Sequence, residues 1–415
     1  MSNPSALSAT IIYHFFYPDD VISARHFSDF AEELVNRDWK VTVLTSNRYC
    51  RYPRRKITIK EEDWRGVHII RIIKPNWNQA NRYWRLANSF WMMVGTILKL
   101  CRLPSTDVIV VGSDPQFSQF LFPILRLLNR QCILAYWCYD LYPEAIIADE
   151  SNGLFRWVAQ GLTSLMGKVY RSVDLLVDIG PCMRKRFDVY QNKALRATLT
   201  PWALVEPNKL HEPDPVTRYD LFGYTRLALL YSGNIGKAHD FDLFLKLARN
   251  VYKIDPQITF CFACRGNRLE ELKEAISSDD YNIRLAPFAE ESKLEKRLNA
   301  ADIHLISLQP EWAGIVVPSK FFGSLAVGKP VIYAGPENSS IAYWIKEFNV
   351  GLVLTQSNMQ QVVEKLVGIA RNPDVMKTWQ KNAIHAYHAY FSKKVVMDRW
   401  DITLRELLNN HTHHS

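Results

Sequence analysis

Short apolar runs alternate with helical patterns along most of this chain, and that alternation constrains the fold more than any other feature of the sequence. Strands that alternate with helices form parallel, wound sheets with helices on their faces. In the first part of the chain the predicted strands are residues 10–16, 41–45, 67–73, 108–112, 133–137 and 175–179. Helical patterns cover residues 23–37, 83–103, 117–128 and 153–169. This series predicts one complete α/β domain.

The alternation stops after residue 200, where four prolines (201, 207, 213 and 215) fall in a stretch without any period. It resumes with predicted strands 227–232, 258–263, 283–285, 303–308 and 331–333. A chain of 415 residues is long enough for two or three domains of about 100–200 residues. The fold class that follows is α/β, with two Rossmann-like domains whose parallel sheets face each other across a cleft. Ligands of such folds bind beyond the carboxyl ends of the strands.

Four segments follow from this pattern. Residues 1–200 are predicted to form the N-terminal domain and residues 201–226 a linker. The second series, residues 227–372, is predicted to form the C-terminal domain. A long amphipathic pattern then predicts a C-terminal helix and tail over residues 373–415, which we expect to pack back toward the N-terminal domain.

The positive charge of the chain is concentrated in one stretch. Residues 48–103 hold 13 Lys and Arg and three acids, a local charge of 13 − 3 = +10 within a total of +9. Four Trp are interleaved with these charges. Three interpretations are open: a solvated basic face, a nucleic-acid surface, or a patch that binds an anionic membrane. The membrane patch is favoured, because anionic headgroups attract Lys and Arg, and Trp prefers the membrane interface.

In the membrane interpretation the amphipathic segment 83–103 supplies apolar area, with Trp91 and Met92 among its apolar residues. No nucleic-acid motif accompanies the charges. The residues predicted to meet the membrane or a membrane-bound acceptor are Arg51, Arg54, Arg55, Lys56, Trp84 and Trp91.

Cysteine usage and the absence of long apolar runs predict an intracellular protein. The seven cysteines are odd in number and lie mostly in apolar runs, as small buried hydrophobes do. Cys261 and Cys264 form a single CxxC inside a predicted strand, which does not favour zinc. No run approaches the roughly 18–20 apolar residues of a spanning helix, and no leader pattern is visible. The expected location is cytoplasmic, on the inner face of the membrane.

The first sequence motif with chemical meaning is the turn after the strand 227–232. Gly233, Asn234 and Lys237 lie between this strand and the next helical pattern. Glycine lets the backbone approach a ligand, and a helix start offers free N–H groups to a phosphate. An ordinary turn closed by a helix cap is the alternative. Asp240 and Asp242 resemble a metal-binding DxD, but acids at a helix start are better explained as caps and first-turn residues.

Two further motifs follow predicted strands. Glu311, Ser319 and Lys320 lie in the segment after the strand 303–308, where Pro318 and Ser319 are typical of a helix start. Two anion sites in one domain suggest a diphosphate. In the first domain, Asp140 follows the strand 133–137 and is a candidate for substrate hydroxyls or proton transfer. A turn or cap role before Pro143 is the alternative for Asp140.

With these motifs in hand, the chain resembles the GT-B glycosyltransferases of retaining family 4 over about residues 10–395, and is most similar to the bacterial branch that builds cell-surface polysaccharides. The resemblance depends on the order and spacing of several weak motifs. They are Tyr13-His-Phe-Phe-Tyr-Pro-Asp19, Asp140-Leu-Tyr-Pro-Glu144, Thr200-Pro-Trp-Ala203, Tyr231-Ser-Gly-Asn-Ile-Gly236, Ala300-Ala-Asp302, Val317-Pro-Ser-Lys320 and Gly328-Lys-Pro-Val331.

This resemblance implies a hexosyltransferase that moves a sugar from a nucleotide-diphosphate donor to a polyprenyl-diphosphate-linked glycan, with retained configuration and without a metal or other cofactor. Gly233, Asn234, Lys237, Ser319 and Lys320 would bind the donor diphosphate. Glu311 would be the first acid of the family's Glu-x7-Glu motif and contact the transferred sugar, with Asp140 opposite it in the cleft. The second acid of that motif, which holds the ribose, is replaced by Gly323.

Two alternatives stay open beside this function. One is another GT-B enzyme, such as a nucleotide-sugar epimerase or an inverting transferase. The other is a glycosyltransferase-like subunit that binds nucleotide or a partner without turnover, which the glycine at position 323 motivates.

Overall fold

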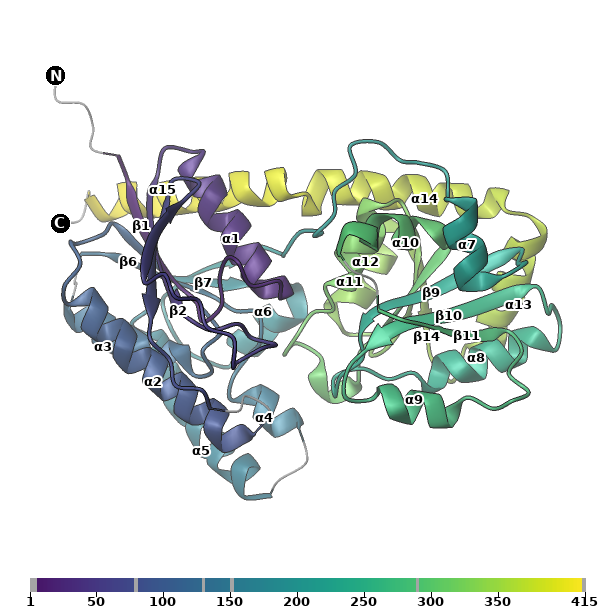
Figure 1. Cartoon of the computed structure of the whole chain (residues 1–415), viewed down its shortest axis with the longest axis horizontal. Helices are drawn as coiled ribbons and strands as arrows, with labels where there is room; N and C mark the ends of the chain where they lie inside the picture. Colours follow the sequence, from purple (N-terminus) through teal and green to yellow (C-terminus); the bar gives the residue numbers. More distant parts are fainter. Residues whose placement is uncertain (1–5, 78–80, 129–130, 150–152, 289–290, 413–415) are drawn as a thin grey trace. The chain divides into compact units, whose positions relative to one another are not determined.

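The computed structural model describes residues 6–77, 81–128, 131–149, 153–288 and 291–412. The chain divides into two compact units, and each has its own sheet (Figure 1). Unit 1 comprises residues 1–200 together with 396–415, and unit 2 comprises residues 201–395.

The sheet of unit 1 has eight strands in the order β3-β4-β2-β1-β5-β6-β7-β8. They are β1 (Ser8–Ile12), β2 (Lys40–Ser46), β3 (Glu61–Trp64), β4 (Val67–Ile72), β5 (Val108–Gly112), β6 (Ile133–Trp137), β7 (Leu175–Asp178) and β8 (Leu195–Thr198). All neighbours are parallel except β3, which pairs antiparallel with β4 at the edge. Because β3 is mostly acidic, no apolar period marks it in the sequence, and it forms only by pairing with β4.

Helices cover both faces of this sheet. They are α1 (Ile22–Val35), α2 (Arg82–Leu100), α3 (Leu121–Leu128), α4 (Glu144–Ala148), α5 (Gly153–Tyr170), α6 (Pro181–Phe187) and α15 (Lys393–Thr412), with a short 3-10 turn, η1 (Ser118–Phe120). The ring of Trp137 in β6 contacts Phe30 of α1 and Trp400 of α15. The preceding residue, Tyr136, points to the opposite face and meets Phe122 of α3. Successive residues of a strand alternate between faces, so α1 and α15 cover one face and α3 the other.

Helix α2 lies on the same face as α3 and α5. A Cβ at Gly95 of α2 would lie 2.5 Å from the side chain of Ile72, so the helix packs closely on β4. Paired residues of neighbouring strands point to the same face of the sheet, and the pairing from β4 through β2, β1 and β5 to β6 places Ile72 and Tyr136 on one face. Tyr136 packs near Tyr170 of α5, so α5 lies on this face too. Three helices therefore form one layer of unit 1 (Figure 1).

The sheet of unit 2 is entirely parallel, in the order β11-β10-β9-β12-β13-β14. Its strands are β9 (Leu227–Asn234), β10 (Ile258–Arg265), β11 (Ile283–Ala286), β12 (Ile303–Ser307), β13 (Val331–Ala334) and β14 (Gly351–Leu354). Its helices are α7 (Pro215–Phe222), α8 (Asp242–Tyr252), α9 (Leu269–Ala275), α10 (Leu294–Ala300), α11 (Lys320–Ala326), α12 (Ser340–Phe348), α13 (Met359–Arg371) and α14 (Asp374–Ala386). Two 3-10 turns, η2 (Glu291–Lys293) and η3 (Pro310–Trp312), and a π turn, η4 (Tyr387–Phe391), complete this unit.

These two wound sheets confirm the predicted α/β class of two Rossmann-like domains with a C-terminal helix. The segment 201–226 differs from a plain linker, because it contains α7. Asp214 caps this helix by accepting a hydrogen bond from the Thr217 N–H at 2.9 Å, and Pro215 occupies its first position. Proline is tolerated at a helix start, so a proline-rich stretch does not exclude a helix there.

Cys261 and Cys264 lie on opposite faces of β10. Cys261 packs with Leu221, Phe222 and Leu230, whereas Cys264 packs in the cluster that contains Phe244 and Phe262. The odd spacing of the two residues in a strand causes this separation. The two thiol groups therefore cannot bind the same metal ion.

Gly351, the first residue of β14, tests how closely β14 packs against β13 in the sheet of unit 2. Its φ is +149°, and a Cβ there would lie 1.9 Å from the Val331 carbonyl oxygen of β13. We expect Gly351→Ala to lower the free energy of unfolding of unit 2 by more than about 3 kcal/mol. The matched control is Gly368→Ala in α13, where a Cβ meets nothing within 4 Å and alanine should stabilise the helix by about 1 kcal/mol. Urea unfolding of both variants measures this difference, and equal shifts would contradict it.

Candidate functional site

In unit 2, Lys320 joins the two motifs that the sequence singled out. Lys320 is the first residue of α11, and its Nζ donates to the Asn234 carbonyl oxygen at 2.8 Å and to the Tyr231 hydroxyl at 3.0 Å. Its aliphatic chain lies against Gly233, where a Cβ would come within 2.7 Å of Lys320 Cε. The φ of +127° at this position also requires glycine. Gly233, Asn234 and Lys320 are thus in contact, as a shared donor site requires.

The Lys320 ammonium has neutral partners. Among the described residues no carboxylate lies within ion-pair distance of its Nζ. Desolvation in this partly buried position lowers the pKa of Lys320 to about 7. Burial, together with the Lys320 charge, also lowers the pKa of the nearby His239, to about 3, and its Nδ1–H donates to the Ser307 carbonyl at 2.8 Å. A cation that contacts a carbonyl and a hydroxyl is suited to bind an anion.

The remaining donor candidates lie around this contact. Asn234 is the exposed last residue of β9, Lys237 is exposed in the turn that follows, and Ser319 directly precedes α11. Glu311 is exposed in η3, the 3-10 turn that follows β12. At Gly323, inside α11, an added Cβ would meet only Leu298, at 3.8 Å, so the helix has room for a side chain where the family pattern has an acid.

Asp240 acts as a helix-start residue. Its Oδ1 accepts hydrogen bonds from the N–H groups of Phe241 at 2.7 Å and Asp242 at 3.2 Å, just before α8. The N-cap position of α8 is Phe241, so Asp240 binds these N–H groups from one residue before the cap, and Asp242 is the acid of the first turn. The first-turn interpretation is confirmed for Asp242, whereas Asp240 does not occupy the N-cap position. Among the described residues, no three His, Cys, Asp or Glu side chains are grouped as metal ligands would be.

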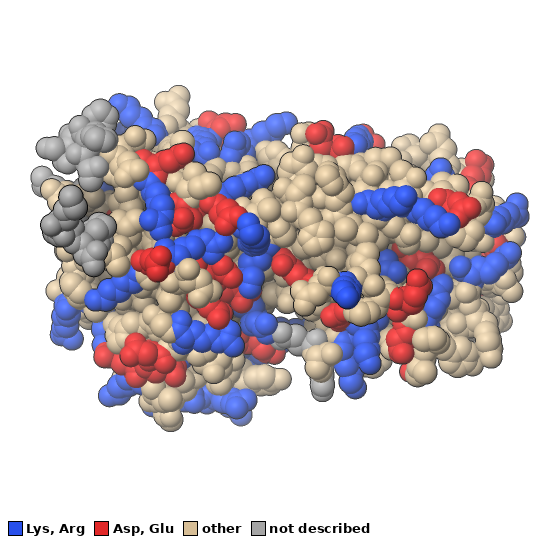
Figure 2. Space-filling view, turned by 90° about the horizontal axis from the view of Figure 1, so that it is seen from above, with Lys and Arg blue, Asp and Glu red and all other residues tan. Residues whose placement is uncertain are grey.

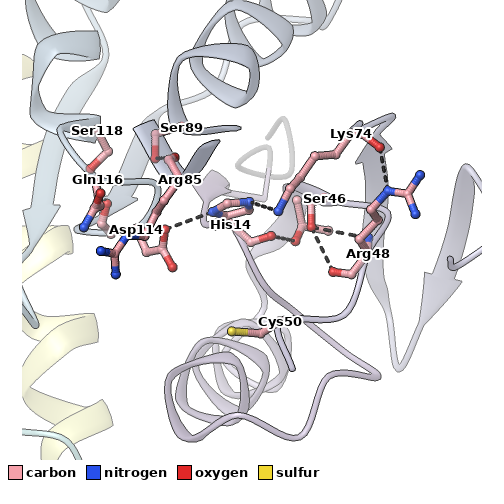
Figure 3. Close-up of polar contacts among 12 residues, drawn as sticks. His14, Ser46, Arg48, Cys50, Lys74, Arg85, Ser89, Asp114, Gln116 and Ser118 are labelled. Carbon is pink, nitrogen blue, oxygen red and sulfur yellow. Dashed lines mark hydrogen bonds and ion pairs between the residues drawn. The ribbon is translucent and has the colours of Figure 1, made fainter. Parts of the chain in front are cut away.

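Unit 1 has a second polar cluster, at the carboxyl ends of β1, β2, β4 and β5 (Figure 3). His14 lies at its centre, between Asp114 on one side and Lys74 on the other. The Arg48 guanidinium donates to the Lys74 carbonyl at 2.7 Å and holds the loop after β4 in place. Sequence reasoning missed this cluster. In the sequence, Asp114 lies just after the predicted strand 108–112, whereas His14 falls inside the predicted strand 10–16; the structure ends β1 at Ile12 and leaves His14 in the loop.

Asp140 lies beside this cluster, after β6. Its N–H and that of Tyr139 both donate to the Ser113 hydroxyl at 3.1 Å, which ties the loop after β6 to the loop after β5. Desolvation and the nearby Asp114 carboxylate raise the pKa of Asp140, although the residue stays exposed. In the same motif Glu144 instead accepts a hydrogen bond from Tyr190. Asp140 is therefore open to a ligand, whereas Glu144 is held by the fold.

The basic stretch 48–103 is only partly a surface patch. Arg71 and Lys74 are buried, and Arg51 pairs with Asp20 at 2.6 Å. Arg54, Arg55 and Lys56 are exposed. Elsewhere, on the face that Figure 2 shows, basic and acidic side chains are interspersed.

Trp84 and Trp91 are exposed on α2, and the ring of Trp77 lies 5.3 Å from Trp84 and 6.2 Å from Trp91. Met92 is only 1% exposed and packs in the core, so its expected place on the apolar surface was wrong. Within the described ranges, none of the helices is both long and apolar enough to cross a bilayer.

With this geometry established, comparison with known proteins shows what unit 2 is similar to. Residues 223–386 match the family model "Glycosyl transferases group 1". We refer to this matched segment, residues 223–386, as the group 1 domain. This group 1 domain contains the whole Gly233–Asn234–Lys320 contact, with Glu311 and Ser319 in the loop before α11.

A curated relative extends the similarity beyond the group 1 domain. "Probable glycosyltransferase WbjE" of Pseudomonas aeruginosa is 25% identical over 276 residues, 64% of this chain and 66% of the relative. The chain thus matches just under two thirds of that protein's length. Together with the group 1 domain, this relative supports the predicted transferase class.

Solved structures share the fold of the chain. Sucrose-phosphate synthase from Thermosynechococcus elongatus has a TM-score of 0.73 at 13% identity and covers 97% of this chain and 100% of its own. The lipopolysaccharide glycosyltransferase WaaG has a TM-score of 0.62 at 16% identity, covering 94% and 98%. Anabaena HepE in complex with UDP has a TM-score of 0.67 at 10% identity, covering 96% and 100%. At these identities the similarity establishes the GT-B fold and nothing finer.

Proposed function

We propose that this chain is a retaining glycosyltransferase that moves a sugar from a nucleotide-diphosphate donor to a polyprenyl-diphosphate-linked glycan during surface polysaccharide biosynthesis. The observation that carries the proposal is the Lys320 ammonium held against Gly233 and Asn234 at the carboxyl edge of the group 1 domain. WbjE is named a glycosyltransferase, and WaaG is described as acting in lipopolysaccharide biosynthesis. The name of WbjE supports the transferase class, and the description of WaaG supports a setting in surface polysaccharide biosynthesis.

The donor chemistry follows from charge. When a sugar leaves a nucleotide diphosphate, the bond from its anomeric carbon to the phosphate oxygen breaks and negative charge collects on the diphosphate. Lys320 and Lys237 would stabilise that charge, which is how preorganised cations accelerate such steps. No metal enters the proposal. HepE has been solved with UDP and with UDP-glucose, which supports a nucleotide-sugar donor here.

Two carboxylates receive roles in this proposal. Glu311 would accept hydrogen bonds from the transferred sugar, and Asp140 would accept one from an acceptor hydroxyl. Both are exposed after strand ends, so each is open to a ligand in its own unit. Because Gly323 lacks a carboxylate, we propose that the ribose is bound without the second acid of the family motif.

The layer of α2, α3 and α5 supports a membrane-bound acceptor. Large apolar side chains point away from the core on all three helices: Phe90 is 66% exposed, Leu127 74% and Trp157 72%. Arg54, Arg55 and Lys56 add positive charge in the loop after β2. We propose that this layer rests on an anionic membrane surface, so that the protein acts as a peripheral protein on its cytoplasmic side, without a nucleic-acid partner.

A transfer assay tests the proposed function. Purified protein is incubated with a panel of nucleotide sugars, with and without a short-chain polyprenyl diphosphate that carries one sugar. We expect transfer only when both are present, and Glu311→Gln should lower turnover while the fold is preserved. Interconversion of the donor would instead indicate an epimerase. Binding of the donor without any change would indicate an inactive subunit.

A further inference from the structure

Three polar side chains form a line across the carboxyl edge of the unit 1 sheet (Figure 3). Asp114 Oδ1 lies 2.9 Å from His14 Nδ1, and His14 Nε2 lies 3.0 Å from Lys74 Nζ. His14 is 2% exposed and Lys74 1%, whereas the Asp114 side chain is 33% exposed. The line therefore starts in the interior and ends in a carboxylate that solvent reaches.

The hydrogen-bond chemistry assigns the protons along this line. An ammonium group only donates, so His14 Nε2 must accept from Lys74 and carries no proton. His14 Nδ1 then holds the proton, and this N–H donates a hydrogen bond to Asp114 Oδ1. Burial lowers the pKa of His14, and the Lys74 charge acts in the same direction. His14 is thus a neutral imidazole between a cation and an anion.

Lys74 is the unusual member of the line, because a buried ammonium is costly without a direct anionic partner. Desolvation lowers its pKa to about 8, so at neutral pH most of the protein still has the ammonium form. Besides Lys74 and His14 themselves, the charged and titratable groups that act on these two residues come from the loops after β1, β2 and β5. They are Asp19, Arg48, Cys50 and Asp114.

This line of hydrogen bonds holds the Asp114 carboxylate in place through one of its two oxygens. Oδ1 of Asp114 is occupied by His14, and the described residues give Oδ2 no hydrogen-bond donor. Asp140 lies in the next loop, joined to the first through the Ser113 hydroxyl. Two neighbouring carboxylates repel a phosphate but accept hydrogen bonds from sugar hydroxyls.

We propose that Asp114 binds a hydroxyl of a neutral sugar at the reactive end of the acceptor, beside Asp140, and that His14 and Lys74 are positioning residues that hold Asp114 for this contact. The inference rests on the proposed function and narrows it, because it makes the terminal sugar of the acceptor glycan an uncharged one and names the residues that hold it.

The first arm of the test is equilibrium binding without any donor. Calorimetry in detergent compares a short-chain polyprenyl diphosphate carrying one neutral sugar with the bare polyprenyl phosphate. We expect the wild-type protein to bind only the sugar-bearing probe, and Asp114→Asn to weaken that binding about tenfold. Equal binding of both probes, no binding of the sugar-bearing probe, or unchanged binding by Asp114→Asn would each overturn the inference.

The second arm is a pH profile of Lys74→Met, measured at saturating donor. Burial lowers the pKa of His14 most, and the Lys74 charge lowers it further, so the variant loses only the second contribution. His14 of the variant should therefore take up a proton at a higher pH than His14 of the wild type, and the acid-side fall of acceptor kcat/KM should begin at a higher pH in the variant. Coincident acid-side profiles of variant and wild type would overturn the positioning role.

The matched control is Lys40→Met, an exposed lysine at the amino end of β2, which should match the wild type in both arms. Near-UV circular dichroism, which reports side-chain packing in both units, shows whether each variant is folded. Donor affinity, a property of unit 2, should stay within about twofold of the wild type. If the wild-type protein binds no nucleotide sugar, the proposed function fails. The donor-free arm still decides the inference about Asp114.

Discussion

Lys320→Met should lower kcat/KM for the nucleotide-sugar donor about tenfold to a hundredfold, because hydrogen bonds to a charged group contribute roughly 1.5–3 kcal/mol. The ammonium is held 2.8 Å from the Asn234 carbonyl, so its position does not depend on a flexible chain finding the diphosphate. Steady-state kinetics at limiting donor measure the loss. The matched control is Lys246→Met, an exposed lysine of α8, which should be neutral.

The pH profile sharpens this prediction. With a pKa of about 7 in the free enzyme, Lys320 loses its proton as the pH rises through neutrality. Donor kcat/KM of the wild type should therefore fall above about pH 7, while Lys320→Met should lose that dependence. A folded variant with wild-type kinetics and the same pH profile would remove Lys320 from the donor site.

Replacing Phe90, Leu127 and Trp157 together by Gln should release the protein from anionic vesicles, lowering its partition coefficient on the order of a hundredfold. Each side chain is more than half exposed on a different helix of one layer, and transfer of a large apolar side chain from water contributes about 1.5–3 kcal/mol when fully buried. Vesicle flotation measures the effect at low and high salt. Because the lost contribution is apolar, it should persist at every salt concentration.

A charge variant separates the electrostatic contribution. Arg54→Glu, Arg55→Glu and Lys56→Glu together should weaken binding mostly at low salt, since screening acts over about 10 Å at 0.1 M. The control exchanges three exposed apolar residues of unit 2, Val216, Tyr224 and Tyr281, for Gln and should float like the wild type. Wild-type protein that stays soluble with anionic vesicles would contradict the membrane proposal.

The sequence by itself determined the elements whose signal is local. Strands β5 and β6 occupy the predicted residues 108–112 and 133–137, because a strand buried on both faces is a continuous apolar run. The turn after β9 and the start of α11 were also predicted, since glycine, proline and serine mark such positions. Elements without a local signal were missed. Acidic β3 forms only by pairing with β4, and α7 begins within a run of prolines.

Only the tertiary structure decided which strand ends meet. Lys320 and the Asn234 carbonyl are 86 residues apart in sequence, and they touch because β9 and β12 are neighbours in the sheet. His14 lies 60 residues from Lys74 and 100 from Asp114, and the three converge because the strands that precede them, β4, β1 and β5, lie within the neighbouring set β4-β2-β1-β5 of the sheet. Hydrophobic periodicity reports which face of a strand is buried but carries no information on strand order. Strand order depends on the packing of helices and sheets over the whole domain, and it is what assembled both clusters.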